Sequence, residues 1–134
     1  MKSEFRYLLD TDTSSYIIRG VPAVLRKAML YKEQFAISSV TRFELNRARG
    51  ELREQNSLTL LDEFLNDVPT LSFEHESADI AASIFNQLER AGTRIGIPDS
   101  MLAGQAIAHN MIFVSNNRKH FKLVPGLMLE NWHD

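Results

Sequence analysis

The 134-residue sequence contains no cysteine. Disulfides and thiolate zinc sites are therefore excluded, and the usual mark of a small secreted domain is missing. A reducing cytoplasm is the simplest location, so we expect a cytoplasmic protein. Glycine and proline are scarce and never gather into a linker, which predicts a single domain over residues 1–134.

Long hydrophobic runs and an excess of positive charge are also missing. No run of about 18 apolar residues is available to span a membrane, and the first residues lack the apolar core of a secretory signal. The net charge is −2, whereas proteins that bind long duplex DNA are usually basic. The charge therefore disfavours general DNA binding but permits an enzyme that contacts nucleic acid locally.

Several common catalytic motifs are absent as well. The sequence has no glycine-rich phosphate loop, no G-x-S-x-G and no HExxH, which disfavours nucleotide-triphosphate, serine-hydrolase and zinc-protease chemistry. The four histidines show no metal-ligand spacing. His120 could approach an RNA phosphate, although a surface histidine is the favoured interpretation.

Short apolar segments alternate with amphipathic segments along the chain. Strands alternating with helices of this length are typical of βαβ units, which predicts an α/β fold with a mainly parallel central sheet and helices on both faces. Strands are expected at 5–9, 34–38, 70–73 and 111–114, with an edge strand in the tail 124–132, and helices at 16–19, 22–31, 39–50, 57–67, 80–91, 98–109 and 118–121.

Polar residues follow the predicted strands. Asp10 closes the first strand, and Asp12 comes two residues later. Glu44 lies in the helix after the second strand, Asp99 in the first turn of the helix near 98–109, and Asn117 after the fourth strand. Because the carboxyl ends of parallel strands meet at one edge of the sheet, these side chains are expected to converge there.

Converging carboxylates repel one another unless a cation lies between them. Oxygen ligands without cysteine favour Mg²⁺ or Mn²⁺, which serve phosphate chemistry. Each acid also has a plain structural explanation: Asp10 could cap a turn, Glu44 could be a solvated helix residue, and Asp99 could be stabilised by a helix dipole. The prediction of a metal site therefore depends on the combination.

Four segments in this order resemble one known family. The segments LLDTDTSSY, ISSVTRFEL, GIPDSMLAGQA and IFVSNNRKHF, followed by the tail VPGLMLENW, are similar to PIN-domain toxins of the VapC type. The resemblance extends from about residue 6 to residue 132. It implies a PIN-like α/β/α sandwich.

The resemblance also assigns roles to residues of this chain. It implies that Asp10, Glu44 and Asp99 are the catalytic and metal-binding acids, and that Ser115 is a supporting hydroxyl. Asn117 occupies a place where many PIN domains carry a fourth acid, which puts a second, tightly held metal in doubt. Asp12 and Asn117 are thus expected to support the site rather than to catalyse.

By the same resemblance, the expected activity is that of a Mg²⁺- or Mn²⁺-dependent endoribonuclease. It would be the toxin of a type II toxin–antitoxin pair and would cut structured RNA, with tRNA, and initiator tRNA in particular, as the first candidate. The implied partners are a VapB-like antitoxin, the RNA substrate and a second copy of the chain, with DNA contacted only through the antitoxin. The antitoxin would place an arginine near the three acids and cover the helices around 14–32 and 41–67.

Two alternatives remain open. A strand ending in D-x-D also fits a haloacid-dehalogenase-like phosphatase, with Asp10 as the nucleophile and Asp12 as the general acid. That family needs a downstream lysine at a helix start and a pair of late acids, and Asp99 has no close acidic partner in the sequence. The other alternative is a PIN-like interaction module without catalysis, against which the retained acids argue.

Overall fold

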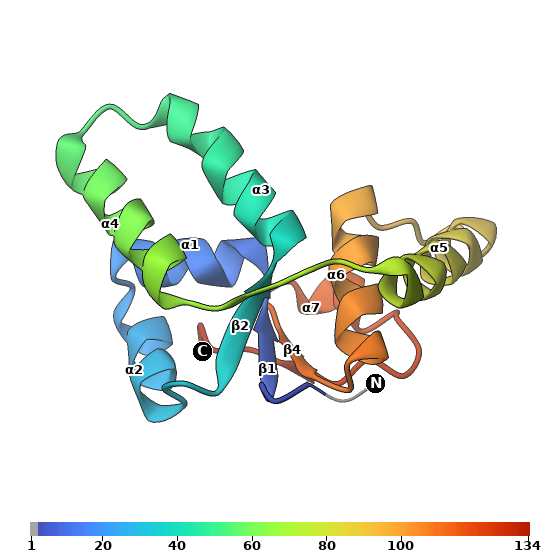
Figure 1. The fold of residues 1–134 in the computed structure, drawn as a ribbon. Helices are drawn as coiled ribbons and strands as arrows, with labels where there is room; N and C mark the ends of the chain where they lie inside the picture. The colour runs from blue at the N-terminus through green and yellow to red at the C-terminus, as the bar shows by residue number, and fades with distance from the viewer. Residues whose placement is uncertain (1–2) are drawn as a thin grey trace.

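The computed structural model describes residues 3–134, and a five-stranded sheet runs through the middle of them (Figure 1). Every strand pair is parallel, and the strand order is β3-β2-β1-β4-β5. This architecture confirms the predicted α/β fold with a parallel sheet. The strands are β1 (Tyr7–Leu9), β2 (Phe35–Ser38), β3 (Thr70–Leu71), β4 (Ile112–Val114) and β5 (Leu129–Glu130).

Helices connect the strands, as parallel pairing requires. Figure 1 shows α1–α4 to one side of the sheet, which we call the first layer, and α5–α7 to the other, which we call the second layer. Among residues 3–134, no helix is both long enough and apolar enough to cross a membrane. The helices are α1 (Thr11–Arg19), α2 (Pro22–Leu30), α3 (Ser39–Ala48), α4 (Gln55–Asp67), α5 (His75–Arg90), α6 (Ile97–Ala108) and α7 (Arg118–Phe121), with a 3-10 turn η1 (Arg49–Glu51) after α3.

Each face of the sheet has its own core. Successive side chains of a strand point to opposite faces, so Tyr7 and Leu9 of β1 pack against the first layer while Leu8 packs against the second. The fully buried β1 therefore forms the floor of both cores. This position fixes the residue that follows β1 at the middle of the sheet edge.

An aromatic cluster closes the first-layer core. Trp132, from the tail after β5, is 1% exposed. Its ring centroid lies 5.4 Å from that of Tyr7, and 5.7 Å from those of Tyr31 and Phe35. The Trp132 indole nitrogen donates a 3.0 Å hydrogen bond to Glu130. The tail is thus anchored in the core rather than laid over the surface.

The second layer depends on a close contact between α5 and α6. A Cβ added at Gly104 of α6 would lie 2.6 Å from the backbone nitrogen of Ala81 in α5, which is too close for any side chain. Next to it, Gln105 is fully buried, and its amide donates to the carbonyls of Leu71 and Ser72 at 3.3 and 3.2 Å. Gln105 therefore joins α6 to the segment that leads from β3 to α5.

The start of α5 differs from the sequence-based expectation. The apolar repeat begins at Ile80, but the helix begins at His75. The first turn is not apolar, and it is held by the backbone bond from Ala78 to Glu74. The end agrees: the chain leaves the helix at Gly92 with φ +74°, a left-handed conformation that glycine adopts without strain.

Candidate active site

The order in which strands are added to the sheet reverses next to β1. The chain passes from β1 to β2 and β3 on one side, and then returns to place β4 and β5 on the other. Ligands of parallel α/β sheets bind at such a reversal, outside the carboxyl ends of the strands. Here the reversal lies between β1 and β4, and the residues that follow these two strands are Asp10 and Ser115.

Asp10 is held firmly at this edge. It is the N-cap of α1, its Oδ1 accepts a 2.7 Å bond from the Thr13 amide, and its own amide donates to Val114 of β4. The side chain is only 5% exposed. Burial raises its pKa to about 6, the nearby Asp12 adds to the rise, and hydrogen bonds from Thr13 and Ser115 oppose it. A cation at this edge would therefore favour the ionised form.

Ser115 links β4 to Asp10. The hydroxyl is fully buried, hydrogen bonds to the Asp10 carboxylate, and accepts a 3.0 Å bond from the Asn117 amide. The Ser115 hydroxyl is thus placed to orient the acid, and its supporting role stays a prediction. Asn117 is half-buried and its side chain lies 3.0 Å from the ring of His120.

Glu44 reaches the same edge from α3. Its Oε1 accepts a 2.5 Å hydrogen bond from the hydroxyl of Thr11, which lies directly after Asp10 in the chain. The Thr11 hydroxyl is also 3.2 Å from that of Thr41. The sequence analysis missed Thr11, although its place between the acids of LLDTDT was a usable signal. Thr11 orients Glu44 towards the end of β1.

Asp99 completes the acidic edge from the second layer. It lies in the first turn of α6 and is half-buried. Burial raises its pKa, the charges of Glu44 and Asp12 raise it further, and the charge of His120 lowers it. Groups from α1, α3, α6 and α7 are thus close enough to affect one another.

Asp12 is exposed in the first turn of α1. Its charge raises the pKa of both Asp10 and Asp99. Asp12 therefore adds negative charge near both carboxylates, and its supporting role stays a prediction.

The donor chemistry suits a hard cation. Asp10, Glu44 and Asp99 provide only oxygen atoms, and the pKa values of Asp10 and Asp99 are raised by burial first and by neighbouring negative charges second. Between residues 3 and 134, no group of three His, Asp or Glu side chains is positioned to enclose a metal by itself. Mg²⁺ and Mn²⁺ prefer oxygen ligands, and Mg²⁺ usually keeps several waters and uses one or two carboxylates.

Fold and site define an α/β protein with an acidic centre at the sheet reversal. Residues 7–127 match the model of the PIN domain family. The chain is 30% identical to the "tRNA(fMet)-specific endonuclease VapC" of Salmonella typhimurium over 95% of this chain and 98% of the relative. It is 34% identical to "Ribonuclease VapC2" of Rickettsia felis over 94% and 97%.

A solved structure agrees with these relatives. The crystal structure of VapBC2 from Rickettsia felis bound to a DNA fragment from their promoter superposes with a TM-score of 0.87 and 30% identity, covering 96% of this chain and 99% of that chain. The chain belongs to the PIN domain family and, within it, to the VapC ribonucleases. The family match favours this assignment over the phosphatase alternative.

Proposed function

We propose that this protein is a Mg²⁺- or Mn²⁺-dependent endoribonuclease and the toxin of a type II toxin–antitoxin pair. The observation that carries the proposal is the acidic edge. Asp10, Glu44 and Asp99 come from three distant segments: Asp10 follows β1, Glu44 bonds to the adjacent Thr11, and Asp99 is near enough to Glu44 for its charge to raise the pKa of Asp99. Two of these three carboxylates have raised pKa values, which are typical of functional sites.

The proposed mechanism gives different roles to the three acids. A bound Mg²⁺ or Mn²⁺ would polarise the scissile phosphate and lower the pKa of a water. Asp10 and Asp99 would hold the ion, with Asp10 fixed by Ser115 and by the Thr13 amide. Glu44, oriented by Thr11, would help to hold the ion or serve as the general base for a water.

Loss of one acid tests this mechanism. Asp10→Asn should abolish cleavage, because it removes a negatively charged ligand of the metal ion. The amide oxygen of the new side chain can still cap α1. Asp79→Asn, an exposed change on α5, is the matched control and should cleave as the wild type does. Cleavage of total RNA should require Mg²⁺ or Mn²⁺ and stop with EDTA. Wild-type rates for Asp10→Asn, or full activity in EDTA, would refute the proposal.

The substrate we propose is tRNA, with the initiator tRNA first. Support comes from the Salmonella relative, whose name specifies tRNA(fMet). Mapping of the new 5′ ends in total RNA after brief expression identifies the target directly. Ends spread over messenger RNA, with tRNA intact, would exclude tRNA as the substrate.

A VapB-like antitoxin is the proposed partner, and any DNA contact is made through it. A groove of about 320 Å³ runs between α1, α3 and α4, next to Asp12. On α2, Met29 and Leu30 are 76% and 66% exposed. Within the range 41–67 that the antitoxin was expected to cover, Leu61 lines the groove but is itself buried. An antitoxin arginine reaching the acids would compete with the cation, because guanidinium pairs with carboxylates bidentately.

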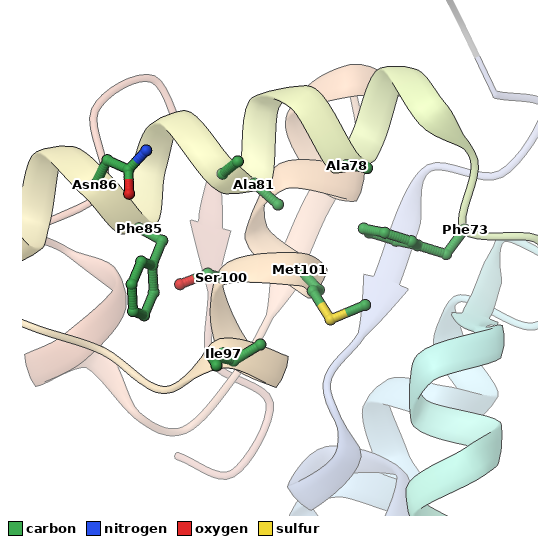
Figure 2. Close-up of a pocket in the computed structure, with 9 residues that line it drawn as sticks. Phe73, Ala78, Ala81, Phe85, Asn86, Ile97, Ser100 and Met101 are labelled. Carbon is green, nitrogen blue, oxygen red and sulfur yellow. The ribbon is translucent and has the colours of Figure 1, made fainter.

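A homodimer is the proposed state of the toxin. A hollow of about 340 Å³ between α5 and α6 is lined almost entirely by apolar side chains (Figure 2). Ile97 at its edge and Phe43 of the adjoining pocket are 63% and 66% exposed. Phe43→Glu should convert the dimer to a monomer in sedimentation velocity, whereas Leu60→Glu, on α4, should leave it unchanged.

A further inference from the structure

His120 lies beside the acidic edge and is exposed to solvent. It belongs to α7, which follows β4 after only three residues. Its ring atom Nδ1 is 3.0 Å from the side-chain amide nitrogen of Asn117. An amide NH₂ group can only donate, so Nδ1 accepts this bond and the proton of the neutral ring is on Nε2. The ring therefore presents a fixed donor, Nε2–H.

Asn117 and Ser115 connect this ring to Asp10. Asn117, which holds the ring, donates from its backbone to the Ser115 hydroxyl at 3.0 Å, and Ser115 hydrogen bonds to the Asp10 carboxylate. His120 is also near enough to Asp99 for a charge on the ring to lower the pKa of that carboxyl. The imidazole is thus positioned by the same residues that position the acids.

A hydrogen-bond donor beside the acidic edge would offset the repulsion between the acids and an RNA phosphate. Asp10, Asp12 and the other acids repel an RNA phosphate, and a metal offsets this only at the scissile group. Close to His120 in the chain, α7 and the residue after it carry two exposed lysines, Lys119 and Lys122, whose positive charges attract phosphate. In the part of the chain that the structure describes, neither lysine forms an ion pair, whereas Arg118 pairs with Asp134 at 3.4 Å.

We propose that His120 binds the RNA substrate, its Nε2–H donating a hydrogen bond to a phosphate oxygen next to the scissile phosphate. This inference rests on the proposed ribonuclease function and adds a contact outside the acidic residues. Lys119 and Lys122 supply the screened, long-range attraction, and His120 supplies the directional contact that sets the register of the strand.

Four single variants test the contact on the full-length protein. His120→Ala removes the donor and should raise KM roughly 10-fold or more, with kcat nearly unchanged, as expected for one hydrogen bond to a charged group. His120→Gln places an amide N–H near the position of Nε2 and should restore most of the binding, whereas His120→Asn places it near Nδ1 and should not. His75→Ala, which removes an exposed histidine at the start of α5, is the control.

Binding is measured separately from cleavage. In the Asp10→Asn background, the Kd for a cleavable tRNA should rise by the same factor when His120→Ala is added. Asn117→Ala should weaken binding less, and adding it to His120→Ala should have no further effect, because both changes act on the same contact. Melting temperatures should be unchanged by His120→Ala, since the side chain is exposed.

The outcomes separate the two proposals. If the wild type cuts RNA and His120→Ala has the same KM and Kd, the contact is refuted and the nuclease stands. A fall in kcat with unchanged KM and Kd would also overturn the binding role. If the wild type neither binds nor cuts RNA in Mg²⁺ or Mn²⁺, the proposed function fails and the contact fails with it.

Discussion

The two layers of helices cover the two faces of the sheet with different kinds of packing. The second layer packs two helices until their backbones touch, at Gly104 and Ala81. The first layer fills its core with large aromatic rings around Trp132 and leaves a groove between its helices. The site is built from both, since Asp10 and Glu44 come from the first layer and Asp99 from the second. Asp10 and Glu44 are held by hydrogen bonds from the Thr13 amide and the Thr11 hydroxyl, whereas Asp99 is positioned by the first turn of α6.

The largest effect is expected in the first layer. Trp132→Ala should lower the free energy of unfolding by roughly 3–5 kcal/mol, the usual cost of removing a large buried side chain. Trp132→Phe keeps most of the ring and should cost less than half as much. Urea denaturation measures both. Equal, small losses would show that the tail is not part of the core.

Gly104→Ala tests the second layer. The added methyl must force α5 and α6 apart, so a loss of roughly 1–3 kcal/mol is expected, although alanine is the better helix former by about 1 kcal/mol. Gly50→Ala is the matched control, because nothing lies within 4 Å of its Cβ. If Gly104→Ala and Gly50→Ala have similar free energies of unfolding, the close contact between α5 and α6 can open at little cost.

The pH dependence of the free energy of unfolding tests the environment of Asp10, the acid that follows β1. Its pKa is raised from 3.8 to about 6 in the folded protein, so the folded state binds the proton more tightly than the unfolded state. The resulting stability is fully present below pH 3.8 and is lost as the pH rises through 6. It amounts to at most about 3 kcal/mol.

Melting curves in EDTA between pH 5 and 8 measure this contribution. The wild type should lose stability relative to Asp10→Asn as the pH rises, because the amide does not titrate. A constant difference between the two proteins across this range would contradict the raised pKa. Saturating Mg²⁺ should reduce the difference if the ion binds at Asp10.

The smallest effect is expected at Asp99. Its raised pKa shows that burial and the charges of Glu44 and Asp12 outweigh the favourable helix dipole. Asp99→Asn should therefore leave the metal-free protein equally stable or slightly more stable, within about 0.5 kcal/mol. A fall in melting temperature well beyond that range would identify Asp99 as a structural residue of the second layer.

Much of the fold could be predicted from the sequence because local patterns encode it. The apolar run that stops abruptly at Asp10 located β1, and the alternation of short strands with helices predicted the parallel sheet. The edge strand near the C-terminus was also expected and is β5. Parallel pairing alone then brought Asp10 and Ser115 to the same edge.

Contacts between distant side chains could not be predicted in this way. The bond from Thr11 to Glu44 joins residues 33 positions apart, and no periodicity indicates it. The bonds of Gln105 depend on the path of the chain after β3. His120 resembled an ordinary surface residue until the structure placed Asn117 against its ring.

The position of β1 also bears on biosynthesis. β1 is made early, but its pairing with β4 joins residues 7–9 to residues 112–114, and the Asp10 amide bonds to Val114. A nascent chain that lacks β4 has neither the bond that fixes Asp10 nor the hydroxyl of Ser115. The acidic edge therefore assembles only after β4 and Ser115 have left the ribosome. The fold thus ties the formation of this edge to synthesis of the chain through residue 115.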